Sequence, residues 1–368
     1  MPSLRVVIVY TLRTIWVLLC NALCIPCYLG WLLLVSPTYL VSPSLFNQLE
    51  QVSMFHYLTI ITMAVMQVFF SWLLTIVSCW CWSAGYQLAE SGASLDHLQH
   101  HRLLILPNHQ STADVPLLMT IFSSRVGFCN KVMWIMDSVF KFTNFGFCSW
   151  MHDDFFIKSG KAGRLSTLVD LKEHLTIVFL PKDRRYLVLF PEGGFLHKRK
   201  AISHEYAKKK DLPLLEHCTL PRTGALDVIM DVLGPASQQV DSQKMEKIID
   251  MTVAFPSSGH PLDLLAIVTG CRQPFVTHVH YREFHCKDIP NTSEELFTWM
   301  VKLYMEKEEM LDKYYKTGEF PHDLFDKDAQ PPKIIEQDPF RYLMVHLFYI
   351  TSVIMFYTII MTAYGLFT

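Results

Sequence analysis

Two residue types that can work together as an acid–base pair follow an apolar run about a third of the way along the chain. In the stretch LPNHQSTADVPLL, Asn108 and His109 come directly after the run, and Asp114 comes five residues after the histidine. A carboxylate that holds one imidazole nitrogen fixes the tautomer and leaves the other nitrogen as a base. An ordinary loop histidine beside a helix-opening aspartate would give the same stretch, so both interpretations stay open here.

The spacing of His109 and Asp114 limits how they can meet. Residues five apart on an ideal helix are about 140° apart around its axis and lie on different faces. The pair can meet if His109 is on the loop that leaves a strand over 103–106 and Asp114 is in the opening turn of a helix. Ser111 or Thr112 suits the N-cap of that helix. Such a pair has no protein nucleophile, so the substrate would have to supply its own hydroxyl.

A second polar segment, YLVLFPEGGFLHKRK, follows another apolar run. It places Glu192, Gly193 and Gly194 at the end of a buried-looking strand, and sites in α/β sheets usually form at strand ends. The two glycines permit a close approach of the backbone. Alone, the segment also fits a simple turn.

Together, NHQSTAD and FPEGGF resemble the first and third blocks of the glycerolipid acyltransferase family, which transfers acyl groups from acyl-CoA to a glycerol hydroxyl. LPRTGA, with Pro221 and Arg222, resembles the fourth block. In the second block, HDDFFIKSG, Lys158 stands where the family usually has an arginine, and a lysine keeps the charge but loses the bidentate fork. The wider likeness is to the lysophosphatidylglycerol acyltransferase branch and covers most of 1–366.

The resemblance implies an endoplasmic-reticulum membrane enzyme that reacylates lysophosphatidylglycerol or lysophosphatidylethanolamine. In it, His109 takes the proton from the free glycerol hydroxyl, Asp114 orients His109, and the oxygen attacks the acyl-CoA thioester. We expect no bound cofactor and no metal, with acyl-CoA as co-substrate. The expected substrate-binding residues are Asn108, Lys158, Glu192, Gly193, Gly194 and Arg222. Arg222 and Lys158 would lie near the lipid phosphate or the CoA diphosphate.

Composition places part of the chain in a lipid bilayer. The 368 residues are 51% hydrophobic and 18% charged, and the formal net charge of -2 gives no argument for nucleic acid. Stretches at about 7–35, 56–82 and 342–366 are long enough to span. Arg5 and Arg13 flank the first stretch, which favours a cytoplasmic amino terminus. Whether the first stretches cross or re-enter stays open.

These features predict three parts: an N-terminal membrane region over 1–89, a cytosolic α/β acyltransferase domain over 90–335, and a C-terminal transmembrane segment over 336–368. Within the middle part, apolar runs alternate with helical patterns, which favours a mixed sheet covered by helices. The expected strands are 103–106, 154–157, 186–190, 251–255, 264–270 and 276–281, and the expected helices include 115–124, 165–176 and 222–233.

Several smaller patterns carry further expectations. Thr292 and Glu295 form a capping box for a helix that Gly318 ends, and its apolar stripe predicts core packing or a membrane-facing side. His278 and His280 alternate on one strand and are expected to pack. The segment KVMWIMDSVFKFTNFGF is a candidate lining for an acyl-chain cavity or for a route from the bilayer, with Met133, Trp134, Met136, Phe140 and Phe142. Each of these residues taken singly also fits a core stripe.

Two other functions compete with acyl-CoA-dependent transfer. One is CoA-independent transacylation between phospholipids, which uses the same chemistry. The other is a non-catalytic membrane protein that binds lipid. Protein partners cannot be assigned from the sequence. The intact set Asn108, His109, Asp114, Glu192 and Gly193 favours an enzyme, because a degenerate member is expected to have lost at least one of them.

Overall fold

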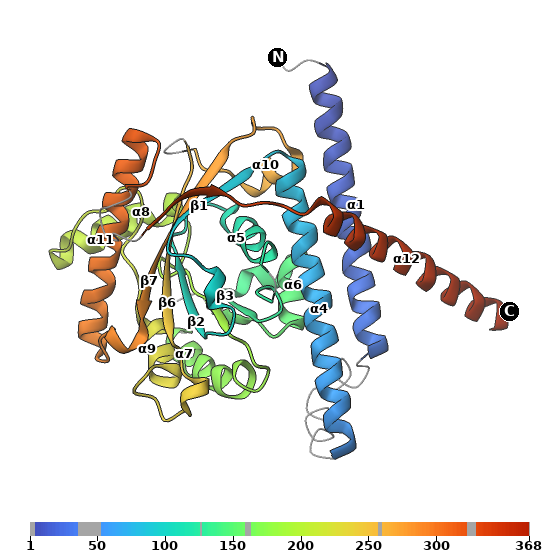
Figure 1. Cartoon of the computed structure of the whole chain (residues 1–368), viewed down its shortest axis with the longest axis horizontal. Coiled ribbons are helices and arrows are strands. Elements are labelled where there is room, and N and C mark those ends of the chain that lie inside the picture. The colour runs from blue at the N-terminus through green and yellow to red at the C-terminus, as the bar shows by residue number, and fades with distance from the viewer. Residues whose placement is uncertain are drawn as a thin grey trace.

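Helices cover both faces of one mixed eight-stranded sheet in the computed structural model (Figure 1). The structure describes residues 4–35, 53–125, 127–158, 163–256, 260–321 and 329–367. The strands are β1 (Gln87–Gly92), β2 (Leu103–Pro107), β3 (Val132–Asp137), β4 (Phe155–Ile157), β5 (Tyr186–Val188), β6 (Lys247–Ala254), β7 (Val276–His285) and β8 (Gln330–Ile334). Their order is β4-β3-β5-β2-β6-β7-β1-β8, with antiparallel pairing of β6 to β7 and of β1 to β8. The predicted mixed α/β fold is therefore confirmed.

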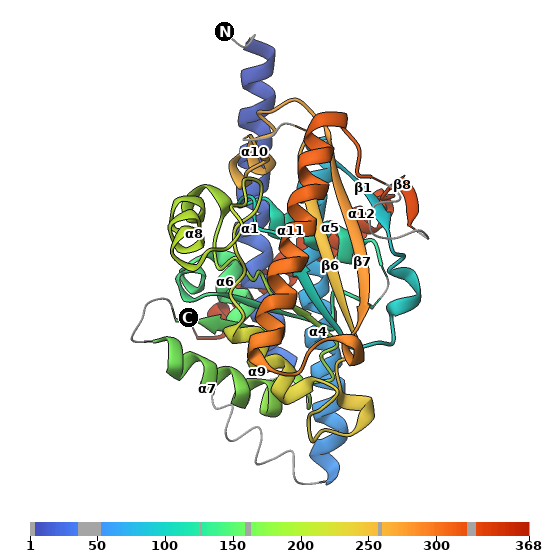
Figure 2. The same cartoon turned by 90° about the vertical axis from the view of Figure 1, so that its left-hand side faces the viewer.

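Helices lie on each side of the sheet, and α11 (Ser293–Thr317) crosses in front of β6 and β7 in Figure 2. The helices are α1 (Leu4–Val35), α4 (Ser53–Ser83), α5 (Asp114–Ser123), α6 (Asn144–Met151), α7 (Arg164–His174), α8 (Leu196–Lys210), α9 (Gly224–Leu233), α10 (Leu264–Thr269), α11 (Ser293–Thr317) and α12 (Pro339–Phe367). Alternate residues of β2 separate the two cores, since Leu103 and Ile105 pack with α1, α4 and α5, whereas Leu104 and Leu106 pack with α9 and α11. Strands buried on both faces need this near-continuous apolar sequence.

Among the residues that the structure describes, three apolar helices are long enough to cross a membrane: Val6–Leu34 in α1, Val65–Ser83 in α4 and Pro339–Leu366 in α12. They differ in how much of their surface the protein covers. The apolar window in α4 is 56% buried and packs against α5, whereas those in α1 and α12 are 33% and 17% buried. Helix α4 therefore connects the apolar helices to the sheet.

Arg13 has a structural role that the charge-bias argument did not include. Its guanidinium donates to the carbonyl oxygens of Trp80 (2.5 Å) and Ile267 (2.8 Å). Those carbonyls lie near the carboxyl end of α4 and in α10, where a cation is favoured by both helix dipoles. Arg13 thus joins α1 to the α/β domain.

The predicted strand over 264–270 is wrong, because the segment folds as helix α10. The Asp263 side chain accepts from the Ala266 amide at 2.7 Å, and Gly270 ends the helix with φ +68°. These two caps outweigh the strand preference of the branched residues between them. Strands β1, β3 and β8 were not predicted; β8 is exposed and contains two prolines, as edge strands tolerate.

Helix α11 agrees with the sequence in detail. The Thr292 hydroxyl accepts from the Glu295 amide, and Gly318 follows the last turn with φ +84°. The apolar stripe faces the sheet rather than lipid, with Leu296, Leu303, Met310 and Tyr314 all buried. His278 and His280 pack on this side, against the rings of Tyr314 and Phe320.

The proposed acyl-chain lining is not one surface. Met133 and Trp134 are neighbours on β3, so they point to opposite faces of the sheet and belong to different cores. Phe142 follows the strand in a short 3-10 helix (Ser138–Phe142) and is 93% exposed. Met133 and Trp134 are thus core residues, and the candidate acyl-chain residues of this segment do not line one surface.

Candidate functional site

The site lies where two parallel strands end side by side. β2 leads into Asn108 and His109, and β5 leads into the turn that contains Glu192. The register pairs Ile105 with Val188, and the Leu189 amide donates to the Ile105 carbonyl at 3.0 Å. Because the carboxyl ends of neighbouring parallel strands meet at one edge, the two sequence blocks converge.

His109 and Asp114 form the hydrogen bond that the sequence predicted. The His109 Nδ1 lies 2.9 Å from Asp114 Oδ2, with the histidine on the loop after β2 and the aspartate at the start of α5. The Asp114 side chain is fully buried, and that of His109 is 11% exposed. The positive end of the α5 dipole favours the carboxylate at this position.

Ala113, rather than the predicted Ser111 or Thr112, occupies the cap position of α5 and makes no side-chain bond there, while the Ser111 hydroxyl accepts from the Ala113 amide at 3.1 Å. The Asp114 carboxylate itself accepts a hydrogen bond from the backbone amide of Ser111, at 2.9 Å to Oδ2. The Ser111 hydroxyl donates to the Leu262 carbonyl, and Thr112 Oγ1 accepts from the Leu264 amide at 2.9 Å. Both side chains thus join the loop to the segment before α10.

The hydrogen bond to Asp114 settles the roles of the two imidazole nitrogens. A carboxylate only accepts, so the proton of the neutral ring is on Nδ1 and the lone pair is on Nε2. The rings of Phe190 and Phe195 pack against the imidazole, with centroids at 4.1 and 4.4 Å. These contacts hold the ring in place while its small exposed fraction leaves it within reach of a substrate.

The Asn108 side chain joins the end of β2 to β6. Its Nδ2 donates to the Val253 carbonyl at 3.0 Å, and its Oδ1 accepts from the Val253 amide at 2.7 Å. The backbone amide of Asn108 also donates to Met251 at 3.3 Å. The side chain is fully buried, so its effect on a substrate would pass through the loop it holds.

Glu192 links three parts of the site. Its Oε1 accepts from the backbone amide of His109 at 2.7 Å, and its Oε2 accepts from the amide and the hydroxyl of Thr219, both at 2.9 Å. Burial raises the pKa of Glu192 to about 8, although these hydrogen bonds and the charge of Lys307 act in the opposite direction. The carboxylate thus holds the turn, one of the two roles predicted for it.

Gly193 and Gly194 adopt backbone conformations that other residues rarely take, with φ +66° and +151°. Two arginines lie over them. A Cβ on Gly193 would be 3.3 Å from Cδ of Arg222, and one on Gly194 would be 3.1 Å from Cδ of Arg199. The turn therefore has two cationic side chains against it, and a role of Arg222 toward a phosphate stays a prediction.

Lys158 is not brought to this cluster. It follows β4, at the same edge of the sheet but three strand positions from β2, which corresponds to roughly 14 Å between backbones. Its Nζ pairs with Asp170 on α7 at 3.3 Å, and both side chains are largely exposed. A role toward a phosphate stays a prediction for Lys158.

Sequence reasoning missed three residues that hydrogen-bond segments around the site: Thr219, Lys307 and Glu308. Thr219 comes two residues before Pro221 in the fourth block, so its position was a usable signal. Lys307 lies in phase with the apolar stripe of α11, four residues after Leu303 and before Leu311. No cluster of metal-ligating side chains occurs in the part of the chain that the structure describes.

Comparisons with known proteins find similar sequences over most of the chain. Residues 93–247 match a family described as Acyltransferase, and residues 267–349 match one described as Acyltransferase C-terminus. Human and mouse acyl-CoA:lysophosphatidylglycerol acyltransferase 1 are 36% and 37% identical over 321 residues, which is 84% of this chain and 82% of each relative. A putative 1-acyl-sn-glycerol-3-phosphate acyltransferase of Caenorhabditis elegans is 30% identical over 65% of this chain and 63% of its own.

Among solved structures, the chain resembles the 1-acyl-sn-glycerophosphate acyltransferase of Thermotoga maritima. The TM-score is 0.41 at 11% identity, and the match covers 80% of this chain and 97% of that one.

Proposed function

The chain belongs to the glycerolipid acyltransferase family and is an acyl-CoA-dependent lysophospholipid O-acyltransferase, and from this premise we propose its acceptor and its catalytic residues. The acceptor is the free glycerol hydroxyl of lysophosphatidylglycerol or lysophosphatidylethanolamine. His109 is the general base, and Asp114 orients it. The observation that carries the proposal is the 2.9 Å contact between these two side chains at the edge of the sheet.

The reaction needs one base and no covalent intermediate. Nε2 of His109 takes the hydroxyl proton while the glycerol oxygen attacks the thioester carbon. The C–O ester bond forms, the C–S bond breaks, and the imidazolium returns its proton to the departing CoA sulfur. Asp114 stabilises the transient imidazolium, because its buried carboxylate contacts Nδ1.

The turn after β5 serves the anionic parts of the substrates. Amide groups in the Gly193–Gly194 turn or at the opening of α5 stabilise the oxyanion that develops on the thioester carbonyl. The Arg222 side chain, which lies over Gly193, binds the lipid phosphate or the CoA diphosphate. Lys158 takes a second phosphate from farther along the same edge.

The protein acts at the membrane of the endoplasmic reticulum, with the domain over 90–335 facing the cytosol and membrane parts over 1–89 and 336–368. The three apolar helices support bilayer association. So does Trp150, which is 52% exposed on α6, a helix that contacts α1, since aromatic side chains are favoured at the bilayer interface. Phe142 is 93% exposed in the short 3-10 helix that contacts α6.

A substrate panel tests the proposal. The purified protein in lipid nanodiscs receives labelled acyl-CoA with lysolipids that carry a second label of their own and differ only in head group: phosphoglycerol, phosphoethanolamine, phosphocholine and phosphate. We expect labelled product with the first two and none when acyl-CoA is omitted. Product formed without acyl-CoA, or an acyl group trapped on a serine or cysteine of the enzyme, would contradict the direct-transfer scheme.

A further inference from the structure

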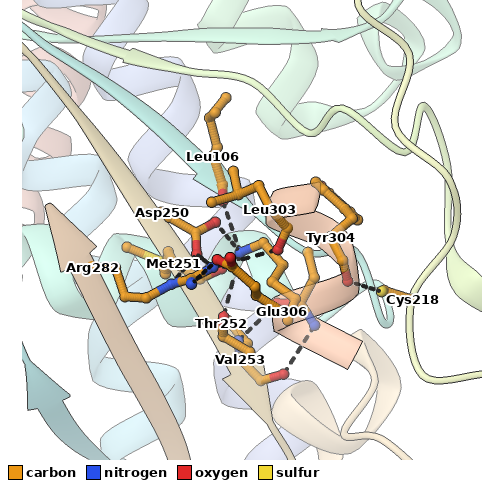
Figure 3. A network of polar contacts seen from close by, with 12 residues as sticks. Leu106, Cys218, Asp250, Met251, Thr252, Val253, Arg282, Leu303, Tyr304 and Glu306 are labelled. Carbon is orange, nitrogen blue, oxygen red and sulfur yellow. Dashed lines mark hydrogen bonds and ion pairs between the residues drawn. The ribbon is translucent and has the colours of Figure 1, made fainter. Parts of the chain in front are cut away.

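One lysine of α11 is buried beneath the catalytic loop. The Lys307 side chain is 0% exposed, and its Nζ lies 2.5 Å from Asp250 Oδ1. The same nitrogen donates to the carbonyls of Met251 at 2.7 Å and Leu106 at 3.2 Å. Figure 3 shows Leu106, Asp250 and Met251 converging beside α11.

This cation belongs to a buried network of charges. Arg282 on β7 donates to the other oxygen of Asp250 at 2.8 and 3.0 Å and to Glu306 at 2.5 Å, as seen in Figure 3. Burial lowers the pKa of Lys307, and the charge of Asp250 opposes that shift. Removing one member of such a network leaves the others uncompensated, so its cost is large and must be separated from any role in catalysis.

The carbonyls that Lys307 binds belong to the strand end that carries His109. Leu106 is three residues before His109, and Pro107 between them has no amide hydrogen. The Met251 carbonyl is shared, because it also accepts from the amide of Asn108 at 3.3 Å. Lys307 therefore joins β2 to β6 at the last residues before the catalytic loop.

Glu308, the next residue on α11, binds the 216–218 segment on the other side of the His109 loop. The Glu308 carboxylate accepts from the backbone amides of Glu216 (2.7 Å), His217 (2.9 Å) and Cys218 (3.2 Å). Thr219 follows directly and donates twice to Glu192, which binds the amide of His109. Gln110, beside His109, donates to the His217 carbonyl at 2.6 Å.

We propose that Lys307 and Glu308 of α11 are positioning residues for acyl transfer. Lys307 fixes the ends of β2 and β6, Glu308 fixes the 216–219 segment, and His109 is held between them. Helix α11 thereby sets the geometry of a site whose reacting groups come from elsewhere in the chain. The inference rests on the proposed function in taking His109 as the base.

Two matched pairs of variants test it, in full-length protein in nanodiscs. Lys307→Met is compared with Lys247→Met, which removes a cation at the start of β6, the end of the strand away from His109, where Lys247 pairs with Glu283 at 2.5 Å. Glu308→Gln is compared with Glu309→Gln, whose side chain is 51% exposed. Each variant is measured for kcat, KM, thermal midpoint and amide hydrogen exchange of the 103–114 peptide.

We expect kcat to fall roughly tenfold or more in Lys307→Met and Glu308→Gln, with KM values within about threefold of wild type. Exchange of the 103–114 amides becomes about tenfold faster in both. The acid limb of the rate profile of Lys307→Met moves to higher pH, because the lost cation no longer lowers the pKa of Glu192. The two control variants show none of these changes.

A double variant separates positioning from charge balance. Asp250→Asn with Lys307→Met removes one anion and one cation, so the buried charges of Arg282 and Glu306 stay paired. We expect its thermal midpoint to recover while kcat stays low. Recovery of wild-type kcat in the double variant, an equal loss in Lys247→Met, or unchanged exchange in Lys307→Met would each overturn the proposal.

The exchange measurement also separates this inference from the proposed function. If His109→Ala keeps wild-type turnover while Lys307→Met still loosens the 103–114 peptide, the base assignment fails and the loop-holding role of Lys307 stands. If His109→Ala is inactive and the peptide is equally protected in Lys307→Met, the base assignment stands and the positioning role fails.

Discussion

The backbone amide of His109 donates to Glu192 Oε1 at 2.7 Å, which joins two loops that are 83 residues apart in the chain. Through this contact the third sequence block, which contains Glu192, positions the first block, which contains His109. It also explains why the carboxylate is buried, because its other oxygen is taken by Thr219 rather than by solvent.

Replacing Glu192 with glutamine should change the pH dependence of activity. Burial raises the pKa of Glu192 to about 8, and all its contacts donate to it, so the ionised form required for them builds up as the pH rises through 8. We expect the kcat of the wild-type protein to rise over that pH range. Glu192→Gln should be less active, and its kcat should not show this rise with pH. A limb that persists unchanged in the variant would exclude Glu192 as its source.

The same shift has a consequence for stability. The unfolded chain loses this proton near pH 4.5 and the folded chain only near pH 8, so the folded state is penalised increasingly as the pH rises between those values. The free energy of unfolding of Glu192→Gln, relative to wild type, should therefore rise from pH 5 to pH 8. Thermal midpoints in nanodiscs at the two pH values measure it, and a constant difference would contradict the expectation.

Asp114→Asn should impair chemistry more than binding. The variant keeps the side-chain shape but cannot stabilise the imidazolium, so we expect kcat to fall roughly 100- to 10,000-fold with little change in KM. Asp231→Asn is the control, because Asp231 is exposed and pairs only with Lys172 on the described surface. A rise in the KM for acyl-CoA with unchanged kcat would instead give Asp114 a role in binding.

Gly193→Ala should affect substrate affinity through Arg222. The residue has φ +66°, which costs an alanine roughly 1 kcal/mol, and its Cβ would press on Arg222 at 3.3 Å. Gly318→Ala is a matched control, because Gly318 has φ +84° and open space around it. Both variants should lose similar stability, and only Gly193→Ala should raise a substrate KM. Equal kinetic effects would show that backbone strain alone is responsible.

The local geometry of His109 and Asp114 could be predicted from the sequence. The residues from distant segments that hold this pair in place could not. The strand before His109 and the helix at Asp114 were readable because apolar patterning and the spacing of the pair allow few arrangements. The order of the strands was not readable, so the separation of Lys158 from His109 could not be foreseen. Helix α10 was taken as a strand because its Asp263 and Gly270 caps were overlooked beside a branched run.

Lys307 shows the limit most clearly. A lysine within an apolar stripe can be read as an exposed residue at the margin of the buried face. Only the pairing of β2 with β6, and the placement of α11 across them, reveals that its ammonium meets Asp250 and the Leu106 carbonyl. Asp250 and Leu106 are 57 and 201 residues from Lys307 in the chain, so the sequence around the lysine carries no pattern that indicates these contacts.

Turnover of labelled acyl-CoA by His109→Ala tests the central claim most directly. His100→Ala is the control, since His100 is exposed and lies before β2, at the opposite end of the strand from His109. With equal amounts of folded protein in nanodiscs, we predict that His109→Ala loses roughly 100- to 10,000-fold in kcat while His100→Ala matches wild type. Wild-type turnover by His109→Ala would contradict the assignment of this imidazole as the base.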